Sequence, residues 1–212
     1  MAKITPQMKL WISDFGRGYT GRNTYGPAAL DRFYKKLWGT SLTEMNRHLL
    51  GKLKIGSVLE VGCNIGMKLN HLQKQGYKNL YGIELQWDAV ERAKRAAKNI
   101  NIIQGSAFDI PFKENYFDLV FTNGVLIHIH PKDLEAAMRE IYRCSKKYIS
   151  GLEYFSETLE EVPYHQEKHA LWKNDFAGLF RKRFPSLKLL KEKKYYHLDG
   201  TGACDSAYLF KK

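Results

Sequence analysis

A loop with two glycines, called the glycine loop below, carries the clearest chemical signal in this sequence. Residues 60–66 read Glu-Val-Gly-Cys-Asn-Ile-Gly and join an apolar run to a stretch with helical periodicity. Glycines at 62 and 66 permit backbone torsions and a close ligand approach that a Cβ atom would block. Asn64 lies between them, and asparagine tolerates left-handed torsions. The loop therefore predicts a site where the backbone meets a ligand.

Two common ligands of glycine loops are poorly supported. A phosphate-binding P-loop requires Gly-Lys-Ser/Thr at its end, whereas Gly66 is followed by Met67 and Lys68. A dinucleotide fingerprint would place glycines at 62, 64 and 67, and two of those positions hold Asn and Met. The E-x-G-x-x-x-G pattern thus argues against a pyrophosphate cradle.

Short apolar runs alternate with helical stretches from residue 57 onward. Strands are predicted at 57–61, 79–83, 101–104, 117–122 and from 147, and helices at 66–75, 88–98 and 131–144. Pro131 suits the first position of the last helix. This alternation implies crossover connections, so the predicted fold class is α/β, with a mostly parallel sheet and helices on both faces.

The first 56 residues break this rhythm. A helix is predicted at 42–53, with Leu42, Met45, Leu49 and Leu53 on one side. Before it, residues 11–23 gather aromatic side chains with a glycine and an arginine. Two interpretations remain open: these residues cover an edge of the sheet, or they cap a ligand site at the carboxyl ends of the strands, where open α/β sheets bind ligands.

The glycine loop resembles the first motif of class I S-adenosylmethionine (SAM) methyltransferases. Three further matches follow in order: Glu84 at the end of the second strand, residues 105–112 (GSAFDIPF) and residues 117–129 (FDLVFTNGVLIHI). The resemblance implies a Rossmann-like class I methyltransferase fold with SAM as its cofactor. It also implies a SAM-binding domain over residues 57–212, with residues 1–56 as a helical cap of that same domain.

The resemblance assigns roles to single residues. Glu84 would hold the ribose hydroxyls, and Leu85 would lie against the adenine ring. The other residues carried over are Glu60, Gly62, Asn64 and Gly66 around the methionine moiety, Ser106 and Ala107 at the adenine edge, and Asn123 near the sulfonium. Asn64 replaces a frequent glycine, and Ser106 stands where many relatives have Asp.

The flanking segments are similar to the pseudaminic acid biosynthesis-associated methylase family. The similarity rests on W-x3-FGxxYxxRN at 11–23, EYF at 153–155, EVPY at 161–164 and LWKNDF at 171–176, and it extends to residues 184–189 and 209–212. It implies a methyltransferase associated with nonulosonic acid and surface-glycan pathways, although an association does not define the acceptor. It also implies that Trp11, Tyr19 and Arg22 close over the SAM carboxylate, an anion that suits an arginine fork.

Methyl transfer from a sulfonium is an in-line displacement that depends on alignment, and a nearby base assists an amine or hydroxyl acceptor. Candidate catalytic residues are His128 after the fourth strand and the pair Glu153 and Tyr154 at the end of the fifth. The alternatives are a packing or cofactor-pocket role for His128 and a loop salt bridge for Glu153. Candidate substrate-binding residues, or else exposed loop residues, are Tyr164, His165 and Asp175.

A catalytic metal is not predicted. The pairs 128/130 and 165/169 bring histidines together without a convincing third ligand. The three cysteines, at 63, 144 and 204, have the spacing of neither a disulfide framework nor a zinc site, and no evident base partner activates one of them as a nucleophile.

Positive charge raises the question of nucleic acid. The 34 Lys and Arg residues against 22 Asp and Glu give a net charge of +12. Residues 1–56 carry +7, residues 57–144 carry +1 and residues 145–212 carry +4. Basic flanks suit an RNA-modifying methyltransferase, but no RNA-binding module and no Asn/Asp-Pro-Pro-Tyr/Phe motif accompany them. A polar or anionic small-molecule acceptor is therefore the first prediction, RNA the second, and a non-catalytic SAM-binding module the third.

Length and hydropathy bound the remaining expectations. A chain of 212 residues fits one domain. No apolar run approaches the roughly 20 residues that span a bilayer, and the first 20 residues lack the apolar core of a signal peptide. We expect a cytoplasmic protein without membrane partners, in an oligomeric state that the sequence leaves open.

Overall fold

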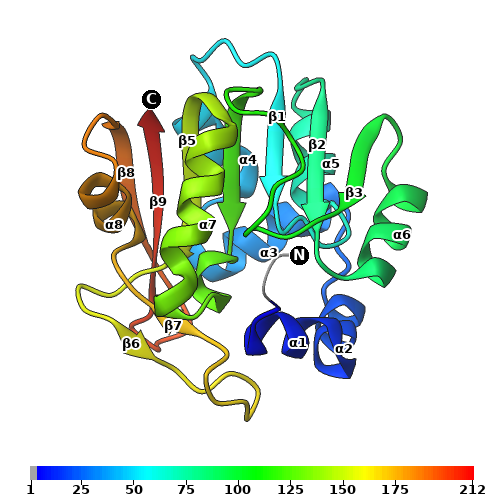
Figure 1. The fold of residues 1–212 in the computed structure, drawn as a ribbon. Helices are drawn as coiled ribbons and strands as arrows, with labels where there is room; N and C mark the ends of the chain where they lie inside the picture. Colours follow the sequence, from blue (N-terminus) through cyan, green and yellow to red (C-terminus); the bar gives the residue numbers. More distant parts are fainter. Residues whose placement is uncertain (1–3) are drawn as a thin grey trace.

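A seven-stranded sheet runs through the centre of the computed structural model, which describes residues 4–212 (Figure 1). The strands are β1 Val58–Val61, β2 Leu80–Glu84, β3 Ile100–Gln104, β4 Phe117–Asn123, β5 Ser145–Tyr154, β8 Lys188–Tyr196 and β9 Cys204–Lys211, in the spatial order β3-β2-β1-β4-β5-β9-β8. Strands β1 to β5 pair in parallel, whereas β9 is antiparallel to both β5 and β8. A separate two-stranded ribbon joins β6 Glu160–Glu161 and β7 Trp172–Lys173. The mostly parallel sheet is as predicted.

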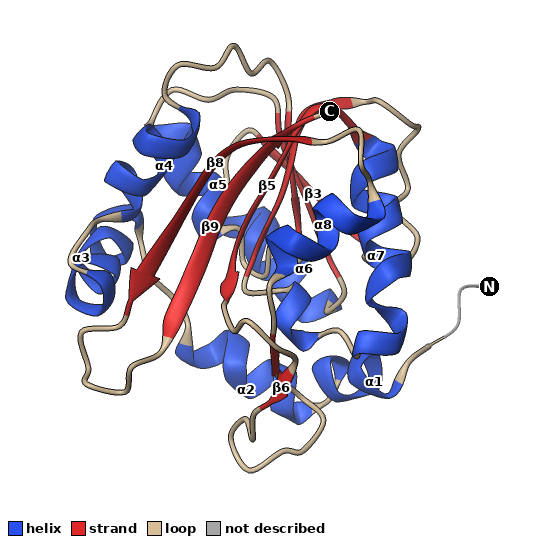
Figure 2. Ribbon diagram, turned by 90° about the vertical axis from the view of Figure 1, so that its left-hand side faces the viewer, coloured by secondary structure: helices blue, strands red, loops and turns tan. Residues whose placement is uncertain are grey.

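Helices cover both faces of this sheet. They are α1 Pro6–Ile12, α2 Asp14–Arg22, α3 Pro27–Trp38, α4 Leu42–Leu50, α5 Met67–Lys74, α6 Trp87–Ala96, α7 Pro131–Cys144 and α8 Phe176–Arg183, with a 3-10 turn at Leu126–His128. Side chains of α3 to α6 pack into one apolar cluster and those of α7 and α8 into another. Figure 2 shows α3 and α4 on one side of the sheet and α7 and α8 on the other. Within residues 4–212, no helix combines the length and apolar character needed to cross a membrane.

The helix predicted over residues 42–53 is three residues too long. Helix α4 ends at Leu50, and Gly51 occupies its C-cap position. Glycine is a poor helix former that favours such ends. Leu53 follows the helix, yet its side chain still packs against the apolar cluster beside α4. Leu53 continues the apolar spacing of α4 because its side chain packs against the same cluster, although the residue lies outside the helix.

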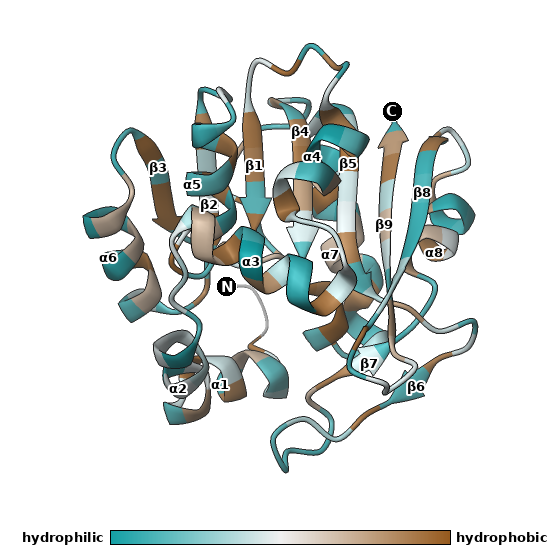
Figure 3. Ribbon diagram, turned by 180° about the vertical axis from the view of Figure 1, so that it is seen from behind, coloured by the Kyte–Doolittle hydropathy of each residue, from teal (hydrophilic) through white to brown (hydrophobic). Residues whose placement is uncertain are grey.

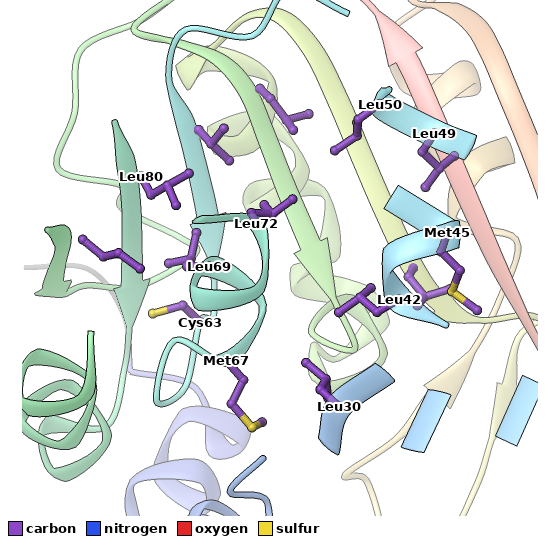
Figure 4. Packing of buried hydrophobic residues seen from close by; sticks show 14 of the residues in the cluster. Leu30, Leu42, Met45, Leu49, Leu50, Cys63, Met67, Leu69, Leu72 and Leu80 are labelled. Atoms are coloured by element: carbon purple, nitrogen blue, oxygen red, sulfur yellow. The ribbon is translucent and has the colours of Figure 1, made fainter. Parts of the chain in front are cut away.

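The N-terminal segment divides into two parts. Residues 11–23 fall mainly in α1 and α2, in agreement with the cap interpretation and not with cover of a sheet edge, whereas α3 and α4 pack on one face of the sheet (Figure 1). Leu30 of α3 and Leu42 and Met45 of α4 are buried in the same cluster as Leu69 and Leu72 of α5 (Figure 4). Helices α1 and α2 instead lie at the arrowhead ends of β1, β2 and β4 (Figure 1). The apolar core that α3 and α4 share with α5 supports the proposal that residues 1–56 and 57–212 form one domain.

A polar network fixes α3 and α4 against α5. Asp31 on α3 accepts hydrogen bonds from the backbone nitrogen and the hydroxyl of Thr43 (2.8 and 2.7 Å), and lies 3.0 Å from Nε2 of the buried His71 on α5. Burial alone would raise the pKa of Asp31, but the bonds from Thr43 and the charge of His71 hold it below its usual value. Because α5 follows the glycine loop directly, this network also fixes the loop.

Strand β8 forms an edge of the sheet and is largely hydrophilic (Figure 3). Lysines occupy four of its nine positions: 188, 191, 193 and 194. Lys191 donates through Nζ to the carbonyls of His48 and of Leu49 (3.2 Å for the latter) near the end of α4. A cation at this place stabilises the carbonyl end of a helix.

Candidate active site

A cleft opens at the carboxyl ends of β1, β2 and β4, beneath α1 and α2. This is the side of an open parallel sheet where ligands bind. Ten of the predicted site residues line it: Trp11, Tyr19, Gly62, Asn64, Glu84, Leu85, Ser106, Ala107, Asn123 and His128. Segments more than 100 residues apart in the sequence thus meet around one space.

The glycine loop follows β1 in a strongly bent conformation. Gly62 has a φ of +73°, and a Cβ atom at this position would lie 2.7 Å from a methyl carbon of Val125. Asn64 has a φ of 49°, in the left-handed region that its sequence position predicted. Its Oδ1 accepts a bond from the backbone nitrogen of Ile65 (2.7 Å). This local bond stabilises the turn and explains why asparagine serves here in place of glycine.

Glu84 ends β2 and links two segments of the cleft wall. One carboxylate oxygen accepts from the backbone nitrogen of Asn64 (2.8 Å) and the other from that of Gln86 (2.9 Å). Burial raises the pKa of Glu84 above its usual value. A carboxylate has about four lone-pair sites, so each oxygen keeps acceptor capacity toward the cleft. This arrangement suits a ligand with two adjacent hydroxyl groups.

Helix α2 is tied to the cleft by Thr20. The amide of Asn64 donates to the Thr20 hydroxyl (3.0 Å), which donates to the side-chain oxygen of Gln86 (3.3 Å). Thr20 is buried. The cap and the glycine loop are therefore held together by hydrogen bonds as well as by packing.

His128 also lines the cleft, after β4 and therefore on the other side of β1 from Glu84, and its ring is held neutral. Its Nδ1 donates to the carbonyl of Ala170 (2.7 Å), so Nε2 remains a hydrogen-bond acceptor. Burial lowers the pKa of His128 to about 4, although the bond to Ala170 opposes that shift. The rings of Trp11 and Tyr164 pack against it at centroid distances of 4.5 and 5.1 Å.

Glu153 is fully buried beneath the turn that carries His128. Its carboxylate accepts from the backbone nitrogens of Val125 (3.0 Å) and Ile127 (3.4 Å). Burial raises its pKa to about 7, against the opposing effect of its hydrogen bonds. Glu153 is thus placed to fix the turn after β4, and its side chain is outside the cleft lining.

The other predicted residues lie around the cleft without lining it. Arg22 is exposed at the end of α2, and Gly66 begins α5 behind the loop. Tyr154 is half-buried at the end of β5, and burial raises its pKa to about 12. Tyr164 and His165 pack near Phe15 of α2, with ring centroids 6.1 and 6.5 Å from it. Asp175 caps α8 by accepting from the backbone nitrogen of Gly178 (2.8 Å).

Several lining residues were not predicted individually. Thr5, Gln7, Met8, Lys68 and Gln86 are among them, and Phe108 and Ile129 were included only as parts of the matched segments 105–112 and 117–129. Lys68 had a usable signal, because it follows Gly66 by two positions and must lie in the first turn of the next helix. Met8 had none, because its place depends on how α1 crosses the cleft. In the part of the chain that the structure describes, no group of three or more His, Cys, Asp or Glu side chains is arranged to hold a metal ion.

Glu60 lies behind the glycine loop and is 1% exposed. Its Oε2 is buried and has no hydrogen-bond partner among residues 4–212. Burial raises the pKa of Glu60 to about 8, although nearby Lys68 opposes the shift. Near neutral pH this side chain is therefore mainly protonated.

This protonation predicts a pH-dependent stability. A carboxyl group with a raised folded-state pKa stabilises the fold at low pH, and that contribution is lost as pH rises from the unfolded pKa through the folded one. Between pH 6 and pH 9 we expect the free energy of unfolding to fall by about 2–3 kcal/mol through Glu60. Glu60→Gln should remove most of this fall, as urea denaturation at the two pH values would show. An equal fall in the variant would contradict the assignment.

The comparison with known proteins agrees with this geometry. Residues 59–148 match the family model described as a methyltransferase domain. Sterol 24-C-methyltransferase of Aspergillus fumigatus is 29% identical over 105 residues, which cover 47% of this chain and 27% of that protein. An uncharacterized methyltransferase of Synechocystis sp. is 32% identical over 89 residues, 42% of each chain. The chain thus spans less than half the length of these curated relatives.

A solved structure extends the likeness to the whole fold. The 1,6-didemethyltoxoflavin N1-methyltransferase of Burkholderia thailandensis, with S-adenosylhomocysteine bound, superposes with a TM-score of 0.71 at 16% identity. The superposition covers 100% of this chain and 91% of that one. At this level of identity the likeness concerns the fold.

Residues 59–148 thus match a methyltransferase domain, and the fold and the cleft of the whole chain agree with a class I SAM-dependent methyltransferase. The predicted enzyme class and the predicted cofactor are confirmed at this level. The residues present also fit SAM, because a backbone loop and a carboxylate with free acceptor capacity face the same cleft. The finer similarity to the pseudaminic acid biosynthesis-associated methylases stays a prediction.

Proposed function

We propose that this chain transfers a methyl group from SAM to a polar small molecule by in-line displacement. The observation that carries the proposal is the shared cleft, which is lined by the glycine loop, Glu84 and His128 together with residues of α1. When bound, SAM supplies an electrophilic methyl group on its sulfonium. The residues of the chain then have to bind and orient SAM and the acceptor and to exclude water. Such positioning accounts for most of the catalysis of an in-line displacement.

Each wall of the cleft would contribute one of these tasks. Glu84 and Leu85 would hold the nucleoside, and residues 106–108 would border the adenine ring. Asn123 would face the methionine moiety, and its amide is oriented by donating to the Tyr34 hydroxyl (3.0 Å). Met8 and Trp11 would cover the bound cofactor and exclude water.

His128 is suited to orienting the acceptor. Its Nε2 can accept a hydrogen bond from an acceptor hydroxyl or amine, which aligns the attacking lone pair. With a pKa of about 4, the ring is a weak base at neutral pH. We therefore propose that His128 aligns the acceptor rather than removing its proton. Glu153 would hold the turn that carries His128, and Tyr154 would border the acceptor site.

The acceptor we propose is a sugar or a nonulosonic acid pathway intermediate. The flanking segments that resemble the pseudaminic acid biosynthesis-associated methylases support this choice. Phe15, Tyr164 and His165 form an aromatic rim beside the cleft, and the exposed Arg22 adds positive charge nearby. The toxoflavin-precursor enzyme of similar fold also has a small-molecule acceptor bound. The cytoplasmic location expected from the sequence stays a prediction.

A methyl-transfer screen tests this function. The chain would be incubated with methyl-labelled SAM and with nonulosonic acid pathway sugars, other polar metabolites or total RNA. We expect label in a sugar product, and His128→Ala should then lower kcat by up to about 100-fold through lost alignment while SAM affinity stays within about threefold. Label in RNA would instead support an RNA-modifying methyltransferase. SAM binding without transfer to any pool would indicate a non-catalytic module.

A further inference from the structure

Lys68 is the one Lys or Arg side chain among the described residues that line the cleft. It is the second residue of α5, directly after the glycine loop. Together with Asn123, it also borders a smaller cavity under α4. Its charge is therefore directed to the inside of the molecule, whereas Lys74 at the other end of α5 is exposed.

The charge of Lys68 has no counter-ion in direct contact among the described residues. Within residues 4–212 no carboxylate oxygen lies within 4.0 Å of its ammonium group. The carboxyl groups that act on it from farther away are Glu60 and Glu153, whose pKa values are raised by burial to about 8 and about 7. Both therefore carry a reduced negative charge near neutral pH. Burial acts to lower the pKa of Lys68, but the net shift of this pKa is upward, so the side chain is a cation near neutral pH.

An unpaired cation inside a cleft is costly unless an anion joins it. The position of Lys68 indicates which anion that is. With the nucleoside held by Glu84 and residues 106–108 as proposed above, the amino-acid tail of SAM would extend toward Gly62 and Asn123, and Lys68 lines the cleft with both and a second cavity with Asn123. That tail ends in a carboxylate.

We propose that Lys68 binds the carboxylate of the methionine tail of SAM. This inference rests on the SAM site and assigns to Lys68 the role that the sequence predicted for Arg22. Arg22 is exposed and lies outside the cleft lining. A charge-assisted bond between an ammonium and a carboxylate is about twice as strong as a neutral one, so the contact would fix one end of the cofactor as Glu84 fixes the other.

Binding calorimetry with two matched ligands tests this assignment. SAM and decarboxylated SAM differ only in the carboxylate. Lys68→Met should weaken SAM binding by about 10–100-fold and change the affinity for decarboxylated SAM by less than about threefold. Lys68→Arg should retain most of the SAM affinity. Lys74→Met, on the exposed end of the same helix, is the matched control and should bind both ligands as the wild type does.

Three results would overturn the assignment. Unchanged SAM affinity in Lys68→Met would exclude the contact, and a loss in Arg22→Met instead would return the role to Arg22. An equal loss of affinity for both ligands would show that Lys68 affects the shape of the cleft and does not bind the carboxylate. Thermal unfolding of each variant checks folding, and Lys68→Gln provides a second neutral variant if the methionine fails to fold. A wild-type chain that binds neither ligand would refute the SAM site itself.

Discussion

Replacing Glu84 with alanine should weaken SAM binding by about 100-fold or more. A hydrogen bond to a charged group contributes about 1.5–3 kcal/mol, and Glu84 has acceptor capacity for two ribose hydroxyls. Every 1.4 kcal/mol or so is a factor of ten in affinity. The carboxylate also accepts from the backbone nitrogens of Asn64 and Gln86. Its removal therefore loosens the glycine loop and the segment after β2 along with losing the ligand contact.

Calorimetric titration with SAM measures this loss. Asp88→Ala is the matched control, because Asp88 is an exposed carboxylate four positions further along, and it should leave the affinity unchanged. Glu84→Gln keeps the shape and one carbonyl acceptor, so its affinity should fall between those of the wild type and the alanine variant. If the Glu84→Ala variant binds SAM with the affinity of the wild type, Glu84 does not belong to the cofactor site.

Replacing Glu153 with leucine should lower the free energy of unfolding by about 3 kcal/mol. The fully buried carboxylate is the acceptor for the backbone nitrogens of Val125 and Ile127. A buried donor left without a partner costs about 1–3 kcal/mol, and leucine fills the space without offering an acceptor. In a chain of this length, the loss corresponds to a fall of roughly 6–12 °C in Tm.

Glutamine at position 153 separates hydrogen bonding from charge. The pKa of Glu153 is about 7, so a neutral side chain resembles a state that the wild type already populates at neutral pH. Glu153→Gln keeps one carbonyl acceptor and should lose less than about 1 kcal/mol. Urea denaturation of both variants decides the matter. A leucine variant as stable as the wild type, or a glutamine variant as unstable as the leucine one, would contradict this role.

The sequence predicted the centre of the fold well because its signals there are local. Between residues 57 and 144 each strand or helix has its own apolar periodicity, and Pro131 begins α7 as expected. The roles of Glu84 and Asn64 were assigned through the resemblance to class I SAM methyltransferases, and that resemblance was visible because the end of a strand and a glycine-containing turn are properties of short segments. The crossing of α1 over the cleft depends on contacts between distant segments, so Met8 and Gln7 gave no signal.

The direction in which a side chain points was the second feature that could not be predicted from the sequence. Arg22 and Lys68 are both cations near the predicted site, and only a three-dimensional arrangement shows that Arg22 is exposed while Lys68 lines the cleft. Glu153 was placed correctly at the carboxyl end of a strand. Its carboxylate nevertheless meets two backbone nitrogens under the turn after β4, and that partnership has no signature in the residues around position 153.

The lysines of β8 contribute to the net positive charge of the chain and have a role that involves no ligand. An edge strand presents free backbone groups to which a strand of a second molecule can add, and natural sheets oppose such growth with charged side chains, lysine above all. Lysines 188, 191, 193 and 194 lie along this edge. A second copy approaching to the strand spacing of about 4.8 Å would bring like charges together, which disfavours pairing. We therefore expect these lysines to protect the folded chain against aggregation and to account for some of the +12 that first suggested a nucleic-acid partner.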